Sequence, residues 1–197
     1  MRKKPEVTEA TRTAIIGAFC LLSKEKPFGK ITVQEIASKA GYNRCTFYQY
    51  FEDIYDLLDY IENIVLSRIK ENFEKNITHD NFSQTFLEAF TRIHKEQAVY
   101  FDILLSPANR THFTEKLMTD VLPIFMERFR LPAKHAKSKY YASMYFATVV
   151  SAIAHWLHEE RALPLDEFSI ILGNVLTNGV MTEITNFQSS IKSKNNY

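Results

Sequence analysis

Residues that form turns are scarce in this chain, and apolar side chains at helical spacing occupy most of its length. Only 5 glycines and 6 prolines occur in 197 residues, whereas a sheet of many short strands needs frequent turns. Apolar residues recur every three or four positions over 54–73, which predicts a long helix. A separate short helix is expected over 98–105 and a last one over 165–187. The whole pattern predicts an all-α protein of about nine helices.

Charge is distributed unevenly along the sequence. Residues 1–50 contain nine Lys and Arg against four Asp and Glu, a net charge of +5, whereas the remainder carries fifteen against nineteen, a net charge of −4. This asymmetry is typical of a nucleic-acid-binding module joined to a second domain, although a window of this length can also reach +5 by chance. We expect a DNA-binding domain over residues 1–52 and a second helical domain over residues 53–197.

Several classes of protein are not expected from this sequence. No apolar run is long enough to span a membrane, and the basic N-terminus is not followed by the apolar stretch of a secretory signal. Two cysteines, Cys20 and Cys45, do not form a disulfide framework. The six histidines lack metal-ligand spacing, and no phosphate loop or nucleophile motif occurs. The sequence predicts a cytoplasmic protein without a membrane segment, a cofactor, a metal site or enzymatic activity.

Residues 32–51 contain signals that start, stop and restart a helix within a short distance. Thr32 and Glu35 form the pattern of a capping box, in which each side chain bonds the other residue's backbone amide. Gly41 can adopt the left-handed conformation that ends a helix, and Asn43 is a favoured N-cap for the next one. Two short helices joined by such a turn, the second over 44–51, form a helix-turn-helix.

The second of these helices has an apolar side that can be buried in a core and a largely polar side that must stay exposed. Phe47 and Phe51 are four residues apart, so they are predicted to point inward together. Consecutive helical positions face different directions, so the neighbouring side chains must remain outside. They form the predicted DNA-contact surface: Arg44, Cys45, Thr46, Tyr48, Gln49 and Tyr50.

The chemistry of this surface suits the major groove of DNA, which is about 12 Å wide and accepts a helix. Arg44 can bond the O6 and N7 atoms of guanine, and Gln49 can pair with adenine. The tyrosine hydroxyls can donate to phosphates. Further phosphate contacts are predicted for Thr32, at the start of the preceding helix, and for Lys30, whose attraction depends on salt.

The segment ITVQEIASKAGYNRCTFYQYFEDIYDLL, residues 31–58, resembles the DNA-binding signature of the TetR/AcrR transcriptional regulators. The resemblance covers about residues 8–60, and the capping threonine, Gly41 and the Thr-Phe-Tyr run at 46–48 fall in register. It implies that the second short helix enters the major groove of double-stranded DNA. One difference is Ile54, flanked by acidic residues, where the family usually has a lysine that touches phosphate. That expected contact is therefore weakened.

The same resemblance implies a homodimer interface on the last two long helices, and their side-chain pattern permits it. Two such helices from each subunit can pair as a four-helix bundle, although the same faces can also pack within one subunit. A dimer suits DNA, because two recognition helices about 34–36 Å apart read successive turns of a near-palindrome. The predicted interface residues are Ala147, Ser151, His155, Gly173, Asn174 and Thr177.

A small-molecule effector in the C-terminal domain is a further implication of the resemblance. An apolar or aromatic effector can bind among aromatic rings with a histidine as polar partner. An aromatic stripe at helical spacing more often forms plain core, so this alternative stays open. The predicted lining residues are Tyr60, Phe86, Phe90, His94, Tyr100, Phe101, Phe125 and Trp156.

Three functions remain open from the sequence. The main prediction is a repressor that binds an inverted-repeat operator and is released by an effector, because steric exclusion of polymerase makes repression the default. The second is a regulator or co-activator controlled by a protein partner through the C-terminal domain. The third is a helical enzyme that uses His94 or His155 with a carboxylate, for which the sequence shows no motif.

Overall fold

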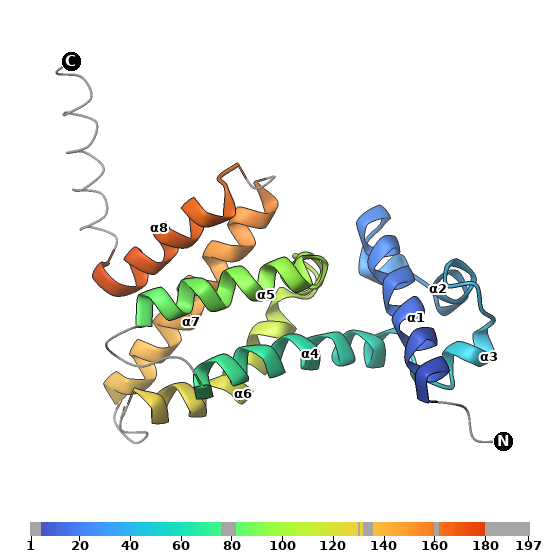
Figure 1. Cartoon of the computed structure of the whole chain (residues 1–197), viewed down its shortest axis with the longest axis horizontal. Helices are drawn as coiled ribbons and strands as arrows, with labels where there is room; N and C mark the ends of the chain where they lie inside the picture. Colours follow the sequence, from blue (N-terminus) through green and yellow to red (C-terminus); the bar gives the residue numbers. More distant parts are fainter. Residues whose placement is uncertain (1–4, 76–81, 130, 132–135, 160–161, 180–197) are drawn as a thin grey trace, which may run out of the picture. The chain divides into compact units, whose positions relative to one another are not determined.

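The computed structural model describes residues 5–75, 82–129, 131, 136–159 and 162–179. All regular elements in those residues are helical, which confirms the all-α prediction (Figure 1). None of the helices described there is long and apolar enough to cross a membrane. The elements are α1 (Pro5–Glu25), η1 (Phe28–Lys30), α2 (Val33–Lys39), α3 (Arg44–Phe47), α4 (Ile54–Lys75), α5 (Phe82–Leu104), α6 (Arg110–Arg128), α7 (Ala136–His158) and α8 (Leu165–Asn178).

The chain divides into two compact units, and three helices contribute to both. Unit 1 comprises residues 1–65 and 99–113, and unit 2 comprises residues 66–98 and 114–197. Helices α4, α5 and α6 each pass from one unit to the other. Unit 1 therefore contains the helix-turn-helix segment together with the end of α5 and the beginning of α6.

Helix α5 accounts for the difference between the nine predicted helices and the eight α-helices in the described residues. The sequence predicts a separate helix from Ala98, whereas the structure continues α5 from Phe82 to Leu104. Gln97 inside it has non-helical dihedral angles, φ −136° and ψ 28°. The predicted break therefore exists as a kink within one helix.

Helix α3 is also shorter than the sequence predicts. Its α-helical part ends at Phe47, and the next residues form a tight turn in which the amide of Tyr50 donates to the carbonyl of Phe47 at 2.9 Å. Such bonds to the third preceding residue wind a last turn more tightly than an α-helix. We call residues 44–50 the recognition segment.

The predicted last helix extends to Phe187, and only part of it lies within the described residues. Helix α8 ends at Asn178, where Gly179 has φ 82°, a conformation that glycine adopts without a Cβ clash. The rest of the predicted helix, from residue 180, lies outside the described residues.

The core of unit 1 forms where α1, α2, α3 and the first part of α4 bury their apolar sides. Helices α1 and α2 pack against each other, as do α2 and α3. Full burial of each large side chain contributes roughly 1.5–3 kcal/mol of transfer free energy. Phe51 is also buried, which confirms both inward-facing predictions for the second short helix. The fully buried side chains include Ile15, Phe19, Ile36, Phe47, Leu57 and Ile61.

A contact between a buried carboxyl group and a histidine lies in the same unit. Glu62 of α4 has no exposed side-chain surface, and its Oε1 lies 2.9 Å from Nδ1 of His112 on α6. The imidazole itself is largely exposed. The contact joins α4 to the beginning of α6 within unit 1, and no local pattern in the sequence predicts it.

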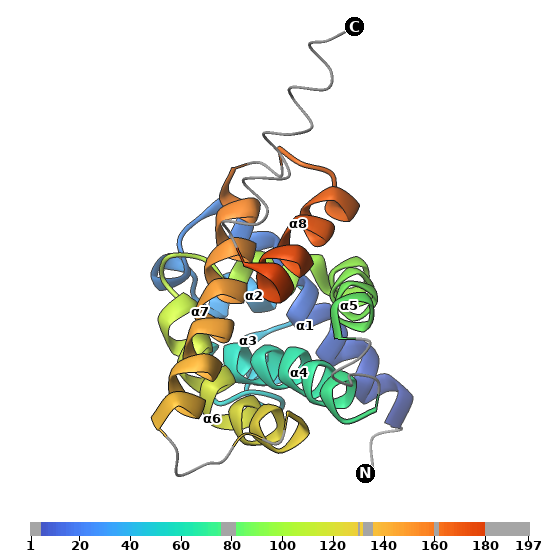
Figure 2. The same cartoon turned by 90° about the vertical axis from the view of Figure 1, so that its left-hand side faces the viewer.

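Unit 2 is built around aromatic contacts between its helices. The rings of Phe125 on α6 and Phe146 on α7 lie 5.3 Å apart, and those of Trp156 on α7 and Phe168 on α8 stack at 4.9 Å. Helices α7 and α8 lie side by side in both views (Figures 1 and 2). An ion pair of 2.8 Å between Lys70 and Asp120 links α4 to α6.

Substitution of alanine for Gly41 should destabilise the protein by about 1 kcal/mol, because its φ of 81° is strained for a residue with a Cβ. Gly17 is the matched control. It lies inside α1 with open space around it, so Gly17→Ala should stabilise by roughly 0.5–1 kcal/mol. Urea unfolding midpoints measure both changes. Equal effects of the two substitutions would contradict the assigned turn.

Candidate nucleic-acid interface

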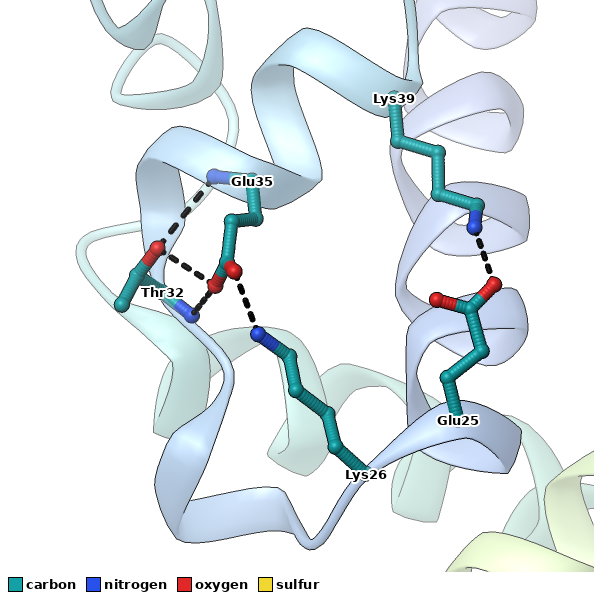
Figure 3. A network of polar contacts seen from close by, with 5 residues as sticks. All are labelled: Glu25, Lys26, Thr32, Glu35 and Lys39. Atoms are coloured by element: carbon teal, nitrogen blue, oxygen red, sulfur yellow. Dashed lines mark hydrogen bonds and ion pairs between the residues drawn. The ribbon is translucent and has the colours of Figure 1, made fainter.

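The N-terminus of α2 is closed by the predicted capping box (Figure 3). The backbone amide and hydroxyl of Thr32 donate to Oε2 of Glu35 at 3.0 and 2.8 Å. The amide of Glu35 donates in return to the Thr32 hydroxyl oxygen at 3.3 Å. The reciprocal bonds fix where α2 begins and satisfy amides that would otherwise lack a helical partner.

Lys26 adds a charge to this cap, with its Nζ 2.5 Å from Oε1 of Glu35 (Figure 3). The hydrogen bond from Lys26, followed by those from Thr32, lowers the pKa of Glu35 from 4.5 to about 2. The carboxylate is therefore ionised at neutral pH and lies at the helix end that attracts anions. A phosphate contact by Thr32, which stays a prediction, would have to share donors already used by Glu35.

A second ion pair connects the other end of α2 to α1. Nζ of Lys39 lies 2.5 Å from Oε1 of Glu25 (Figure 3). An exposed pair of this kind contributes little to stability. The pair instead helps to fix the direction of α2 relative to α1, because both ends of α2 are linked to residues in or next to the end of α1.

The turn between α2 and α3 has the bonds of a Schellman motif. The amide of Tyr42 donates to the carbonyl of Ala37 at 2.8 Å, and that of Gly41 donates to the carbonyl of Ser38 at 3.1 Å. Gly41 has the left-handed φ of 81° that this motif requires. Ala37 is fully buried, which is consistent with a small residue where two helices cross.

Asn43 begins α3 as the sequence predicts. Its Oδ1 accepts a bond of 2.9 Å from the amide of Thr46 and one of 3.3 Å from the Thr46 hydroxyl. Phe47 is fully buried one residue later, and its ring lies 5.7 Å from that of Phe51. The cap and the buried ring together determine which sides of the recognition segment face outward.

Most of the predicted DNA-contact residues are exposed to solvent. Thr46 and Tyr50 are half-buried, and Arg12 lies 5.8 Å from the Tyr50 ring centroid. Lys30, at the end of η1, is exposed. The exposed members of the recognition segment are Arg44, Cys45, Tyr48 and Gln49.

One residue of this surface was not predicted from the sequence. Gln34, on the first turn of α2, accepts a hydrogen bond of 2.5 Å from Nε of Arg44. The sequence places Gln34 only inside the capping-box pattern, and ten positions separate it from Arg44. The contact depends on the angle between two helices, so no local signal could have identified it.

The predicted effector residues are divided between the two units. Tyr60, Tyr100 and Phe101 belong to unit 1, and the side chain of Phe86 lies outside the described residues. The remaining four belong to unit 2 and contact other aromatic rings: Phe90, His94, Phe125 and Trp156.

Two hollows in the described structure have different linings. One, of about 590 Å³, lies between α5 and α8 in unit 2. Its lining includes Arg92, Lys95 and Asp166, together with Ser169. The other, of about 530 Å³, lies in unit 1 between the end of α1 and residues 102–109. None of the predicted effector residues lines either hollow.

The predicted interface residues lie on α7 and α8. Ala147, Ser151 and His155 form an exposed line along α7, and Thr177 is exposed on α8. Asn174 is half-buried and Gly173 is buried within unit 2. No cluster of histidine, cysteine and carboxylate side chains suited to a metal occurs among the described residues.

The helix-turn-helix and its outward polar side chains define a DNA-binding transcriptional regulator, and comparison with known families agrees. Residues 18–61 match the model of bacterial regulatory proteins of the tetR family, and residues 80–178 match a model of the C-terminal region of transcriptional regulators. The chain belongs to the TetR family of transcriptional regulators. No curated protein matches its sequence significantly.

Solved structures show the same fold at low sequence identity. The fatty acid degradation regulator FadR from Bacillus halodurans superposes with a TM-score of 0.64 at 14% identity, covering 91% of this chain and 98% of that one. SmeT, the repressor of the Stenotrophomonas maltophilia multidrug efflux pump SmeDEF, has a TM-score of 0.60 at 18% identity, covering 86% and 89%. The dihydroxyacetone kinase operon activator DhaS has a TM-score of 0.53 at 19% identity, covering 87% and 97%.

Acid should remove the contribution of the Glu35 cap to stability. Because the folded-state pKa is lowered to about 2, the contribution is complete above about pH 4.5 and declines as the pH falls toward 2. Glu35→Gln should therefore flatten the dependence of the urea midpoint on pH in this window. Lys26→Met removes the largest cause of the lowered Glu35 pKa, so it should also weaken much of this pH dependence. A Glu35→Gln protein as sensitive to acid as the parent would contradict the assignment.

Proposed function

We propose that this regulator binds an inverted-repeat operator as a homodimer and represses transcription by excluding polymerase. The observation that carries the proposal is the burial of Phe47 together with the exposure of Arg44 and Gln49 on the recognition segment. These two side chains have the donors and acceptors that distinguish guanine and adenine in the major groove. One such segment reads only a few base pairs, so a symmetric pair is needed for an operator.

The outer surface of α7 and α8 supports the dimer. Tyr140 and Met144 are 69% and 66% exposed at the start of the line that Ala147 and Ser151 continue, and Ile170 on α8 is 54% exposed. Large apolar side chains exposed next to small ones are typical of a surface that another subunit covers. A two-fold axis through this surface would bring together two helices from each subunit.

An effector that releases the protein from DNA is the second part of the proposal. Its support is the match of residues 80–178 to a regulator C-terminal region and the hollow between α5 and α8. The effector would act by preferring a state in which the recognition segments are misplaced for DNA. Compounds that raise the unfolding temperature and also lower operator affinity would support it, and stabilising compounds that leave operator affinity unchanged would not.

The direction of regulation is tested separately, because structures with this fold include a named repressor and a named activator. Repression predicts that deletion of the regulator raises expression from a promoter that contains its operator. A fall in expression would instead favour an activator, including one controlled by a protein partner.

Selection of bound sequences from random DNA tests base reading. We expect a short inverted repeat for the parent protein and, for Arg44→Ala, loss of preference at one symmetric position. The expected loss is about 1–3 kcal/mol per base contact, since a bidentate contact to guanine has that magnitude. Equal weakening on all sequences would instead make Arg44 a phosphate contact.

A charged side chain in the α7 line should abolish tight operator binding without altering the recognition segment. Ala147→Arg would place like charges against each other across the two-fold axis, so the protein should become monomeric at concentrations where the parent is dimeric. Thr119→Arg, at an exposed position of α6, is the matched control. Sedimentation and operator titration measure both properties. A monomeric variant that binds the operator as tightly as the parent would overturn the dimer proposal.

A further inference from the structure

The side chain of Arg44 is held by a chain of hydrogen bonds that begins on α2. Nε2 of Gln34 donates to the hydroxyl of Ser38 at 2.9 Å, and Oε1 of Gln34 accepts from Nε of Arg44 at 2.5 Å. A guanidinium group has donors only, so just the carbonyl oxygen of the amide can face it. The orientation of the Gln34 amide therefore follows from its contact with Arg44, and the hydroxyl of Ser38 can accept from the amide nitrogen.

The contact with Gln34 leaves the two terminal nitrogens of the Arg44 side chain available for DNA. The guanidinium group donates from Nε, Nη1 and Nη2, and Gln34 occupies the first of these. Nη1 and Nη2 have no hydrogen-bond partner within the part of the chain that the structure describes. They form a fork at the tip of the side chain that matches two neighbouring acceptors, such as O6 and N7 of guanine.

We propose that Gln34 is a positioning residue that sets the base specificity of Arg44. By occupying Nε, it excludes the approach in which an acceptor pair bonds Nε and one terminal nitrogen. By holding the flexible side chain before DNA arrives, it reduces the conformational entropy lost on binding. This inference rests on the proposed base contact of Arg44.

The identity of the holding residue matters because it is neutral. Other basic side chains of unit 1 are held by carboxylates, as in the pairs of Lys26 with Glu35 and Lys39 with Glu25. Such partners offset the positive charge that attracts DNA. Gln34 fixes the direction of the Arg44 guanidinium without offsetting its charge.

A double-mutant cycle of Gln34→Ala and Arg44→Ala tests the proposal. Operator affinity is measured for the selected sequence and for operators changed at each symmetric position. Gln34→Ala should reduce discrimination by about threefold to tenfold, the size expected for one hydrogen bond. The reduction should occur only at the position that Arg44→Ala affects, and Gln34→Ala should have no further effect in the Arg44→Ala background.

Two more variants separate positioning from other roles. Gln34→Glu keeps an acceptor for Nε but adds a negative charge, so it should preserve the base preference while lowering affinity on all sequences. Thr13→Ala, at an exposed position of α1, is the matched control and should leave the preference unchanged. Alanine is favourable at an exposed helical position, so the unfolding temperature of Gln34→Ala should stay near that of the parent.

The outcomes distinguish this inference from the function on which it rests. Loss of preference with Arg44→Ala but none with Gln34→Ala would overturn the positioning role alone. An effect of Gln34→Ala that persists in the Arg44→Ala background, or that falls on another base pair, would make Gln34 an independent contact and would also overturn it. An Arg44→Ala protein that keeps every base preference would overturn the base contact and this inference together.

Discussion

The burial of Phe47 is the constraint on which the rest of the interface depends. Its side chain is fully buried, so the recognition segment can rotate about its axis only by exposing a large apolar ring. The Asn43 cap fixes where this segment begins, and the left-handed Gly41 fixes its angle to α2. Because backbone and core set this orientation, the outward residues can be chosen for chemistry that DNA requires.

The polar contacts around α2 then determine how those residues are presented. The ionised Glu35 carboxylate occupies the start of α2, so this end of the helix is less suited to phosphate than the sequence suggests. Positive charge is retained at Arg44, where a neutral amide holds the side chain. The interface thus separates a capped, internally paired helix end from an arginine whose holding partner is neutral.

The sequence predicts the parts of this structure that depend on local signals. The capping box at Thr32, the turn at Gly41 and the Asn43 cap were predicted because each is specified by residues a few positions apart. Contacts between distant positions, such as Gln34 with Arg44 and Glu62 with His112, were not predicted because they depend on helix packing. The kink at Gln97 was expected as a break between helices, since periodicity does not distinguish the two. The effector and interface residues remain predictions.

Methylation protection of guanine N7 on a selected operator shows whether the recognition segment enters the major groove, because that atom lies there. A dimer with both recognition segments in the major groove should protect two patches, about 10–10.5 base pairs apart from centre to centre, on one face of the duplex. The patches should lose guanine protection at one symmetric position when Arg44 is replaced by alanine. Tight binding that leaves every guanine N7 open to methylation would contradict a recognition segment in the major groove.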